Sequence, residues 1–358
     1  MCGETAGRRP SVARVTNHRM RIARVDRSAV LVVAEPSSAG PDARPDRAAP
    51  VRIGLDRDGL VPDAAGERWA PTVGDYVVVG ARPDGVSRLA ELLPRRTQLV
   101  RDSADGTSRT QALAANVDVV LIVEHLSPDP DLGRVERLLT LAWRSGARPV
   151  VVLTKVDLVL EGAGLAAEVS RAAPGVDVHA VSATADTGLE PLRAILAPGA
   201  TLVVVGPSGA GKSTLVNALA GVEAMVVGDR RADGRGRHTT THRELVELTG
   251  GAVLIDTPGL RAVGVVADAD AVEATFADVA ELALRCRFGD CAHDREPGCA
   301  VREALESGEL PERRYESWRR LAREAAWQAR RSDARLAAVE KSRWKQRTLG
   351  RRRQADRR

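Results

Sequence analysis

The chain has 358 residues, a formal net charge of +5 and 28% charged residues, an ordinary composition for a globular protein of two or three domains. No apolar run approaches the roughly 18–20 residues that span a bilayer. The N-terminal residues MCGETAGRRP lead into no apolar segment of the secretory type. We therefore expect a cytoplasmic protein with no membrane partner.

Short strand-like runs separated by turn signals fill residues 12–96. Basic and apolar residues alternate over 12–35, and VRIGLD and GDYVVVG follow a Pro- and Ala-rich stretch at 36–50. No helical pattern interrupts these runs, which is typical of a small β-barrel. An oligonucleotide-binding (OB) barrel is one candidate, and an SH3-like barrel without a nucleic-acid role is the other.

Residues 100–264 have a different pattern, in which continuous apolar runs alternate with helical patterns. The apolar runs are VDVVLIVEHL, ARPVVVLTKVDL, VDVHAVSA and TLVVVG. Helical patterns separate them at DLGRVERLLTLAWRSG, GLAAEVSRAA and GLEPLRAIL. This alternation predicts an α/β domain with a parallel sheet that is covered on both faces.

Two short motifs at the ends of these strands are suited to reading guanine. The first is Thr154-Lys155-Val156-Asp157, and Ser182-Ala183 follows the next strand. The Asp157 carboxylate can accept hydrogen bonds from N1–H and the 2-amino group of guanine, which adenine lacks. Ser182 and Ala183 fit the loop behind the base. Asp157 argues against a P-loop kinase or ATPase.

A complete phosphate-binding loop follows the strand TLVVV and precedes the helical run STLVNALAG. Its glycines allow backbone N–H groups to surround phosphate, Lys212 reaches the outer phosphates, and the Ser213 hydroxyl can bind Mg²⁺. We assign nucleotide binding to Gly206, Pro207, Ser208, Gly209, Ala210, Gly211, Lys212, Ser213 and Thr214.

Two switch-like segments follow the phosphate loop. Asp256-Thr-Pro-Gly259 comes after the strand AVLI, where the carboxylate of Asp256 suits the magnesium side and the Gly259 N–H suits the γ-phosphate. The polar loop before it offers Thr240, with Thr239 as the alternative, as a second Mg²⁺ ligand. We expect His238, Lys212 and Thr240 to be the catalytic residues. The alternative is a surface loop of hydroxyls with a solvent-facing histidine.

Leu260 stands where Ras-type enzymes place the glutamine that orients the attacking water. Leucine neither donates to water nor accepts from it. Slow intrinsic hydrolysis is therefore expected, with His238 or a large partner supplying the missing group. The guanine motifs also precede the phosphate loop, the reverse of the usual order. This predicts a circularly permuted P-loop GTPase domain, which requires only that the original chain ends lie close together.

Three cysteines and one histidine are grouped after this domain, at Cys286, Cys291, His293 and Cys299. Three thiolates and one imidazole complete a tetrahedral shell with no open position, which favours one structural Zn²⁺. Buried free thiols are the alternative. We place a helical zinc-binding domain at 265–340.

A basic tail occupies residues 341–358, where nine Lys or Arg residues accompany one Asp. Such a charge suits a polyphosphate partner, although a solvated tail that binds nothing specific is the alternative. Trp344 lies among the cations of this tail and can stack on a base. Trp318 and Trp327 are expected to pack against the body of the protein.

With these motifs in view, the chain resembles the circularly permuted, ribosome small subunit-dependent GTPase A family. GPSGAGKST, GRHTTTHREL, DTPG, CRFGDCAHDREPGCAV and AANVD (114–118) carry the resemblance, which covers nearly the whole chain. It implies an N-terminal OB-type barrel, GTP bound with Mg²⁺, one zinc, ribosomal RNA contact and GTP hydrolysis stimulated by the small subunit during its late maturation. The insertion at 36–50 and the Thr in TKVD, where many members have Asn, depart from the family pattern.

The sequence is compatible with two functional hypotheses. One is a monomeric GTPase that acts on the maturing small ribosomal subunit. The other is a GTP-gated RNA-binding module in which hydrolysis is incidental. GTP turnover with and without small subunits separates them.

Overall fold

The computed structural model describes residues 18–34, 49–81, 84–102, 110–221, 243–248, 250–256 and 268–332. The chain divides into two compact units, which we treat separately. One contains residues 1–71 and 75–94, and the other contains 72–74 and 95–358. The segments expected to carry both switches and the basic tail, at 222–242, 257–267 and 333–358, lie outside the described residues.

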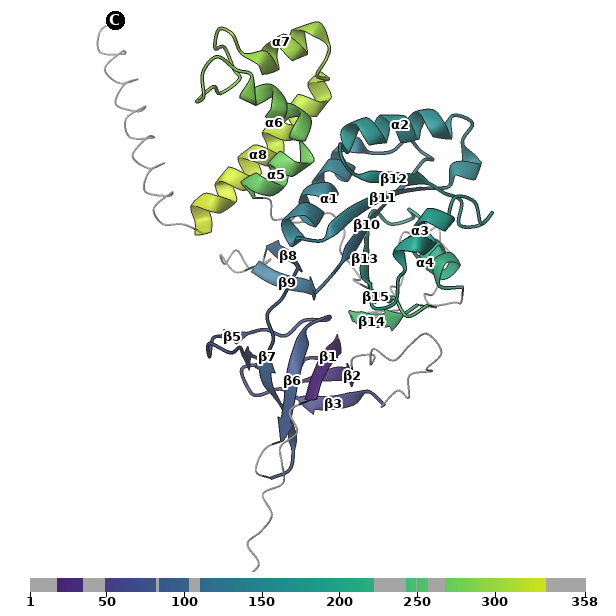
Figure 1. Cartoon of the computed structure of the whole chain (residues 1–358), viewed down its shortest axis with the longest axis vertical. Helices are drawn as coiled ribbons and strands as arrows, with labels where there is room; N and C mark the ends of the chain where they lie inside the picture. The colour runs from purple at the N-terminus through teal and green to yellow at the C-terminus, as the bar shows by residue number, and fades with distance from the viewer. Residues whose placement is uncertain are drawn as a thin grey trace, which may run out of the picture. The chain divides into compact units, whose positions relative to one another are not determined.

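The first unit is a small antiparallel barrel (Figure 1). Its strands run in the order β3-β2-β1-β6-β7, and β7 also packs beside β3. A separate short hairpin, β4–β5, packs against β7 through β4. The bounds are β1 (His18–Val25), β2 (Ala29–Ala34), β3 (Val51–Gly54), β4 (Val61–Pro62), β5 (Arg68–Trp69), β6 (Tyr76–Ala81) and β7 (Ser87–Leu92). The order matches the five-stranded OB barrel and confirms the predicted class.

Alternating side chains fill this barrel, as the period-2 pattern predicts. Ile22, Val30, Val32, Ile53 and Val77 are almost completely buried and form its core. Some intervening positions face outward, among them Arg24 and Arg52, whose guanidinium groups both bind Asp26. These contacts stabilise the barrel surface opposite its apolar interior.

The second unit contains a six-stranded sheet in the order β12-β11-β10-β13-β15-β14, in which only β14 is antiparallel. Its strands are β10 (Val119–His125), β11 (Arg148–Thr154), β12 (Asp177–Ala180), β13 (Thr201–Val205), β14 (Glu244–Glu247) and β15 (Val253–Asp256). The strand β13 that leads to the phosphate loop follows β10–β12 in the chain but lies between β10 and β15 in the sheet. This arrangement confirms the predicted circular permutation.

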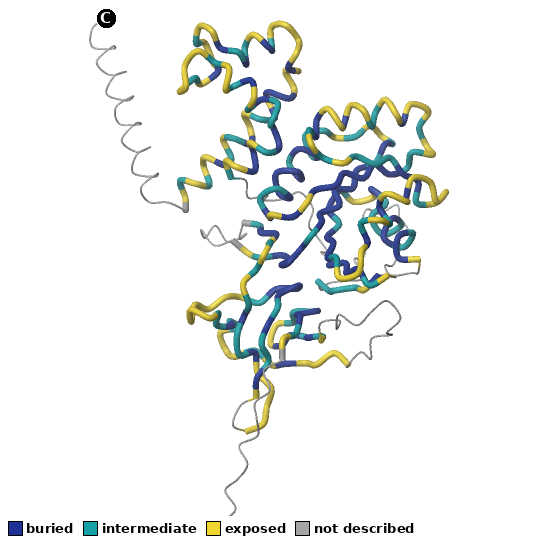
Figure 2. The backbone as a smooth tube through the Cα atoms, in the orientation of Figure 1, coloured by how far each residue is buried: buried dark blue, intermediate teal, exposed yellow. Residues whose placement is uncertain are grey.

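Helices cover both faces of this sheet (Figure 1). Alternate residues of β10, such as Leu121 and Val123, share a core with the helices α3 (Glu190–Ile195) and α4 (Lys212–Ala220). The helices α1 (Leu132–Ser145) and α2 (Gly162–Ala172) pack on the strands from the other side. The burial colours of Figure 2 show the central strands as a continuous buried band.

A hairpin of β8 (Gln98–Asp102) and β9 (Thr110–Ala115) precedes this sheet. No sequence pattern predicted this hairpin. Its end is fixed by Asn116, a buried residue in the left-handed region (φ 54°), whose side chain binds the carbonyl of Gly74 and the N–H of Arg96. The AANVD segment is therefore a structural junction at the start of the sheet.

The C-terminal helices belong to the same unit as the sheet. They are α5 (Ala269–Thr275), α6 (Ala277–Leu284), α7 (Ala300–Ser307) and α8 (Glu312–Ser332). Phe276, at the bend between α5 and α6, is fully buried in their core. Of the tryptophans expected to pack, Trp318 packs against this core, but the prediction for Trp327 is wrong, because it is 48% exposed and lies under Arg331.

A buried ion-pair network joins these helices to α1. The carboxylate of Glu136 in α1 is fully buried and accepts hydrogen bonds from Arg313 and Arg314 of α8 at 2.8–3.0 Å. Arg314 also binds Asp278 and the carbonyls of Ala172 and Thr275. Burial opposes the charge on Arg314, but Asp278 and Glu136 raise its pKa above the ordinary value. We call these contacts the Glu136 joint.

Candidate nucleotide site and zinc cluster

The predicted guanine and phosphate motifs all lie at the carboxyl ends of neighbouring parallel strands. TKVD follows β11, Ser182-Ala183 follows β12, the phosphate loop follows β13, and Asp256 ends β15. In open parallel sheets ligands bind at this edge, because the connections that leave neighbouring strands turn to opposite faces of the sheet and open a crevice. The fold therefore brings motifs that are up to 102 residues apart in sequence to one crevice.

The phosphate loop has the backbone of an anion cradle. Gly206, Gly209 and Gly211 have φ values of 144°, 81° and 81°, which favour glycine. A Cβ on Gly206 would lie 2.0 Å from the Val123 carbonyl oxygen, so no other residue fits there. Lys212 Nζ donates to the carbonyls of Gly206 and Pro207 at 3.0 and 2.7 Å, which holds the ammonium over the loop.

Several N–H groups of this loop are available to a ligand. Those of Ser208, Gly209, Gly211, Ser213 and Thr214 have no acceptor among the residues that the structure describes. They occupy the loop and the first turn of α4, where the helix dipole adds positive potential. A polyphosphate fits this donor set, and the hydroxyl of Ser213, the predicted magnesium ligand, lies in the same turn.

The Thr of TKVD ties the guanine loop to the phosphate loop. Thr154 Oγ1 is buried, 2.6 Å from the Ala210 carbonyl oxygen and 3.2 Å from that of Glu124. A hydroxyl carries one proton, so the shorter contact is the hydrogen bond. The next residue, Lys155, turns the chain with a φ of 62°, and Asp157 is exposed in the short helix that follows.

The second guanine loop is closed on itself. Ser182 and Thr187 exchange two backbone hydrogen bonds of 3.0 Å, and the Ser182 hydroxyl accepts the Ala185 N–H. Ser182 is buried and Ala183 packs against the core beneath the sheet. The turn therefore presents a fixed backbone at the same edge of the sheet as TKVD.

Some predicted site residues cannot be located. His238, Thr240 and Gly259, together with Leu260, lie outside the described residues, as does the side chain of Asp256. The catalytic role of His238 and the magnesium role of Thr240 therefore stay predictions. The described part of the crevice contains the residues that are predicted to contact the base and the phosphates.

One supporting pair behind the crevice was missed at the sequence level. Glu124, the buried acid in the apolar run VVLIVEHL, accepts a 2.7 Å hydrogen bond from Arg134 Nε. Its backbone neighbours Val123 and Thr154 contact the phosphate loop. A carboxylate inside an otherwise apolar strand is the signal that indicates such a pair.

The four predicted zinc ligands are brought together. The ligand atoms of Cys286, Cys291, His293 and Cys299 all lie within 4.8 Å of one another. His293 Nδ1 is 3.6 Å from Cys286 Sγ and 3.4 Å from Cys299 Sγ, and these two sulfurs are 3.9 Å apart. A tetrahedron with Zn–S bonds of about 2.3 Å has edges of about 3.8 Å, so the donor set fits one structural zinc.

The electrostatics of the cluster also suit a metal. Burial raises the pKa of Cys286, but N–H groups of Val301 and Ala300 at the start of α7 outweigh it and place the pKa below its ordinary value. Burial lowers the pKa of His293, which keeps the imidazole neutral. Burial raises the pKa of Cys291 to about 11, so bound metal is what would hold its thiolate.

A second layer of contacts holds the ligand loop. Backbone N–H groups, including those of Glu296 itself and Asp294, lower the pKa of Glu296 to about 2. Tyr315 donates to the His293 carbonyl at 2.7 Å, and the ring of Trp318 lies edge-on to the His293 ring at 5.7 Å. Such outer contacts orient the ligands.

Comparisons with known proteins agree with this geometry. A family model described as RsgA GTPase matches residues 92–266. The small ribosomal subunit biogenesis GTPase RsgA of Streptomyces coelicolor is 52% identical over 279 residues, which cover 76% of this chain and 75% of that protein. The small ribosomal subunit biogenesis GTPase RsgA 2 of Listeria monocytogenes is 46% identical, with coverages of 77% and 78%.

Solved structures show the same fold. YjeQ from Thermotoga maritima matches with a TM-score of 0.61 and 25% identity, covering 86% of this chain and 98% of that one. YloQ, described as a circularly permuted GTPase, matches in fold with a TM-score of 0.57 at 24% identity, covering 89% and 98%. The sequence identity over most of the chain, the permuted sheet and the Cys₃His cluster lead to one conclusion: the chain belongs to the RsgA GTPase family.

Proposed function

We propose that this protein binds GTP with Mg²⁺ and hydrolyses it to GDP and phosphate during late maturation of the small ribosomal subunit, where it contacts ribosomal RNA. The observation that carries the proposal is the crevice. In it the Thr154 hydroxyl of TKVD donates a hydrogen bond to the Ala210 carbonyl of the glycine-rich phosphate loop. Relatives at 46–52% identity are named small ribosomal subunit biogenesis GTPases. The OB-type barrel and the basic tail add surfaces suited to RNA.

Different described residues bind different parts of the nucleotide. The N–H groups of the phosphate loop and Lys212 bind the phosphates and disperse the charge that develops during hydrolysis. Asp157 reads guanine, Lys155 and Val156 form the loop beside it, and Ser182-Ala183 back the base. Magnesium, with Ser213 and Thr240 as its predicted protein ligands, would neutralise the phosphate oxygens.

The test is GTP turnover by the purified protein with and without small ribosomal subunits. We expect slow intrinsic turnover, because Leu260 cannot orient water, and stimulation of tens-fold or more by the subunits. Large subunits serve as the control. Equal turnover under all three conditions would contradict the proposal.

A second candidate is a GTP-gated RNA-binding module with incidental hydrolysis, which Leu260 favours. It predicts that a non-hydrolysable GTP analogue tightens co-sedimentation with small subunits whereas the subunits leave turnover unchanged. The ratio of GTP turnover with subunits to turnover without them therefore separates the two candidates.

We further propose a cytoplasmic monomer with no membrane partner and with domains at 12–96, 100–264, 265–340 and 341–358. Among the described helices, none is both long and apolar enough to cross a bilayer. Light scattering of the purified protein, with and without GTP, tests the monomer. A mass near 76 kDa, about twice the 38.1 kDa of one chain, would contradict it.

A further inference from the structure

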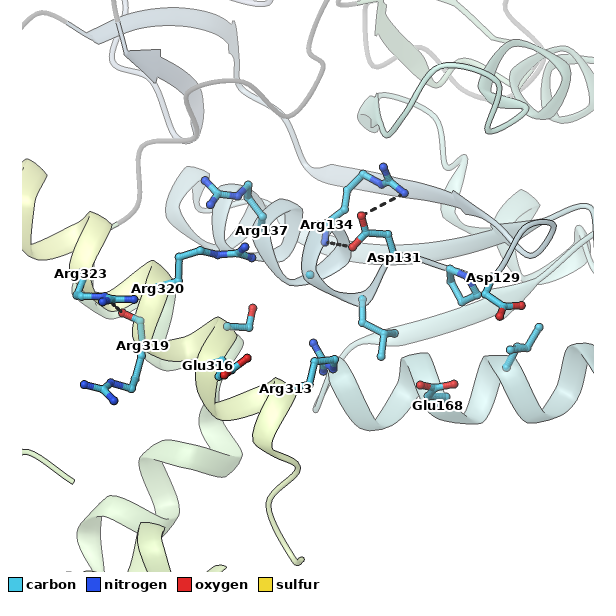
Figure 3. Close-up of a pocket in the computed structure, with 15 residues that line it drawn as sticks. Asp129, Asp131, Arg134, Arg137, Glu168, Arg313, Glu316, Arg319, Arg320 and Arg323 are labelled. Atoms are coloured by element: carbon cyan, nitrogen blue, oxygen red, sulfur yellow. Dashed lines mark hydrogen bonds and ion pairs between the residues drawn. The ribbon is translucent and has the colours of Figure 1, made fainter. Parts of the chain in front are cut away.

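A groove of about 1090 Å³ between α1, α2 and α8 carries charges that the chain itself compensates (Figure 3). Six arginines line it, and four acids line it beside them. Three further acids bind its arginines: Glu124 binds Arg134, Glu324 binds Arg137, and Glu136 binds Arg313. The charge of this groove therefore does not indicate a further partner.

Two exposed aromatic rings of the second unit are also compensated within the chain. The ring of Phe288 has the Arg287 guanidinium 5.5 Å from its centroid, and the ring of Trp327 has the Arg331 guanidinium at 4.5 Å. The face of an aromatic ring is electron-rich and attracts a cation. In both cases a nearby residue on the chain supplies that cation.

Trp69, on the β4–β5 hairpin of the barrel, is different. Its side chain is half exposed, and within the described part of the chain no guanidinium or ammonium lies over its ring. The adjacent Arg68 is held elsewhere, because its Nη2 donates to Asp58 Oδ1 and to the Leu60 carbonyl, both at 2.9 Å. The exposed ring of Trp69 therefore has no cation of the kind that Phe288 and Trp327 have.

Hydrogen bonds fix the position of the Trp69 ring. Its Nε1 donates to Asp63 Oδ2 at 2.9 Å. The other oxygen of Asp63 accepts the N–H groups of Ala65 and Glu67 at 2.9 and 3.0 Å. Opposite Trp69, Val61 of β4 is buried against the barrel. Because the indole N–H is already satisfied, the ring offers a partner its π face and not a hydrogen bond.

The segment around this ring is acidic, although the whole chain is basic. We call residues 56–70 the Trp69 hairpin. It contains four acids (Asp56, Asp58, Asp63 and Glu67) and two arginines (Arg57 and Arg68), which is a formal charge of −2 in a chain of +5. A negative surface repels phosphate groups and attracts basic side chains. A nucleobase would bring its phosphates to this surface, so the charge favours a basic protein segment over RNA.

We propose that the Trp69 hairpin is a docking surface for a basic protein segment, with an arginine or lysine side chain over the indole ring and neighbouring cations beside the acids. This inference rests on the proposed function for the source of the segment, which is then a basic protein of the small ribosomal subunit. The hairpin is a sheet of its own, separate from the five strands of the barrel. The barrel therefore has a protein contact apart from the strands suited to RNA.

The first test observes the ring itself. The full chain is labelled with fluorotryptophan, and the Trp69 resonance is identified by its absence from the fluorine NMR spectrum of Trp69→Leu. A short peptide of alternating Arg and Gly and a short oligouridylate are added separately. We expect the peptide to shift the Trp69 resonance to saturation and the oligouridylate to leave it in place. No shift with the peptide, or an equal or larger shift with oligouridylate, would overturn the inference.

The second test measures binding of variants to the peptide, and to small subunits in the presence of a non-hydrolysable GTP analogue. Trp69→Leu should bind both about fivefold more weakly, whereas Trp69→Phe, which keeps a ring, should lose less. Glu67→Lys reverses one exposed charge of the hairpin and should also weaken both. Val86→Ala removes an exposed apolar side chain elsewhere in the barrel and should match the unaltered protein.

Protection of β1 and β6 from hydrogen exchange should be the same in all four variants, which shows that the barrel is folded. Tighter binding of Glu67→Lys to subunits would assign the hairpin to RNA and overturn the inference. Subunit binding of Trp69→Leu equal to that of the unaltered protein would overturn it as well. If the unaltered protein binds the peptide but no subunits, the proposed function fails, and the peptide comparison still decides the docking surface.

Discussion

The nucleotide crevice and the zinc cluster are built by opposite means. The crevice is made from backbone N–H groups at the ends of fully buried strands, so the sheet fixes its shape before any ligand binds. The zinc cluster is made from four side chains in the segment between α6 and α7, which has little regular structure of its own. Substitution of a crevice residue should therefore abolish function and leave the fold intact. Removal of the zinc should instead unfold the segment that binds it.

The largest expected effect is removal of a zinc ligand. Cys299→Ser should reduce bound zinc from one per chain to nearly none and expose α6 and α7 to hydrogen exchange, because metal binding supplies about 10–16 kcal/mol to small zinc folds. Protection of β10 and β13 should be unchanged. Zinc analysis and hydrogen exchange measure both parts, and Cys2→Ser is the matched control. Unchanged protection of α7 would show that its packing suffices without metal.

A substitution in the crevice should lower activity without lowering stability. Lys212→Ala should reduce GTP turnover on the order of 10²–10³-fold, since it removes a charge that contacts the developing transition state. Its thermal midpoint should match that of the unaltered protein, because the carbonyls of Gly206 and Pro207, to which the Lys212 ammonium donates, belong to the loop and not to the buried strands. A large fall in the midpoint together with turnover would mean that the ammonium also holds the loop.

The Glu136 joint connects α1 of the sheet to the zinc-bearing helices. Substitutions in it show how far the stability of one depends on the other. Glu136→Gln removes one of the two carboxylates that the buried Arg314 binds among the described residues and leaves Asp278 as the other, which should cost about 3 kcal/mol of unfolding free energy. Urea unfolding measures this cost. Arg137→Gln breaks the partly exposed pair with Glu324 nearby and should cost less than about 1 kcal/mol. Equal costs would mean that burial at the joint is not what stabilises it.

Sequence patterns predicted the crevice better than the joint, for a physical reason. A phosphate loop depends on local backbone geometry, so its glycines and lysine are recognisable in one short segment, and the buried strands that position it are continuous apolar runs. The four zinc ligands were recognisable by their side-chain chemistry. Glu136 and Arg314 are 178 residues apart, and each alone is typical of a solvent-exposed helix position. Only the packing of α8 on α1 makes them a buried pair, and the same packing leaves Trp327 exposed.

The smallest expected effect concerns the Thr of TKVD, whose amide-to-hydroxyl replacement departs from the pattern of many family members. In the structure the hydroxyl of Thr154 keeps the link to the phosphate loop through Ala210. Thr154→Val preserves the shape and removes this hydrogen bond, leaving the buried Ala210 carbonyl unpaired. The cost should be about 1 kcal/mol, or about fivefold in GTP affinity.

Titration with a fluorescent, non-hydrolysable GTP analogue measures this change, and Thr154→Ser is the control that retains the hydroxyl. GTP-over-ATP preference should be unaffected in both variants, because we expect Asp157, and not Thr154, to read the guanine edge. Loss of that preference in Thr154→Val would mean that the link to Ala210 also positions Asp157. The two guanine and phosphate loops would then act as one unit, even though the permuted chain makes them 56 residues apart in the reverse of the usual order.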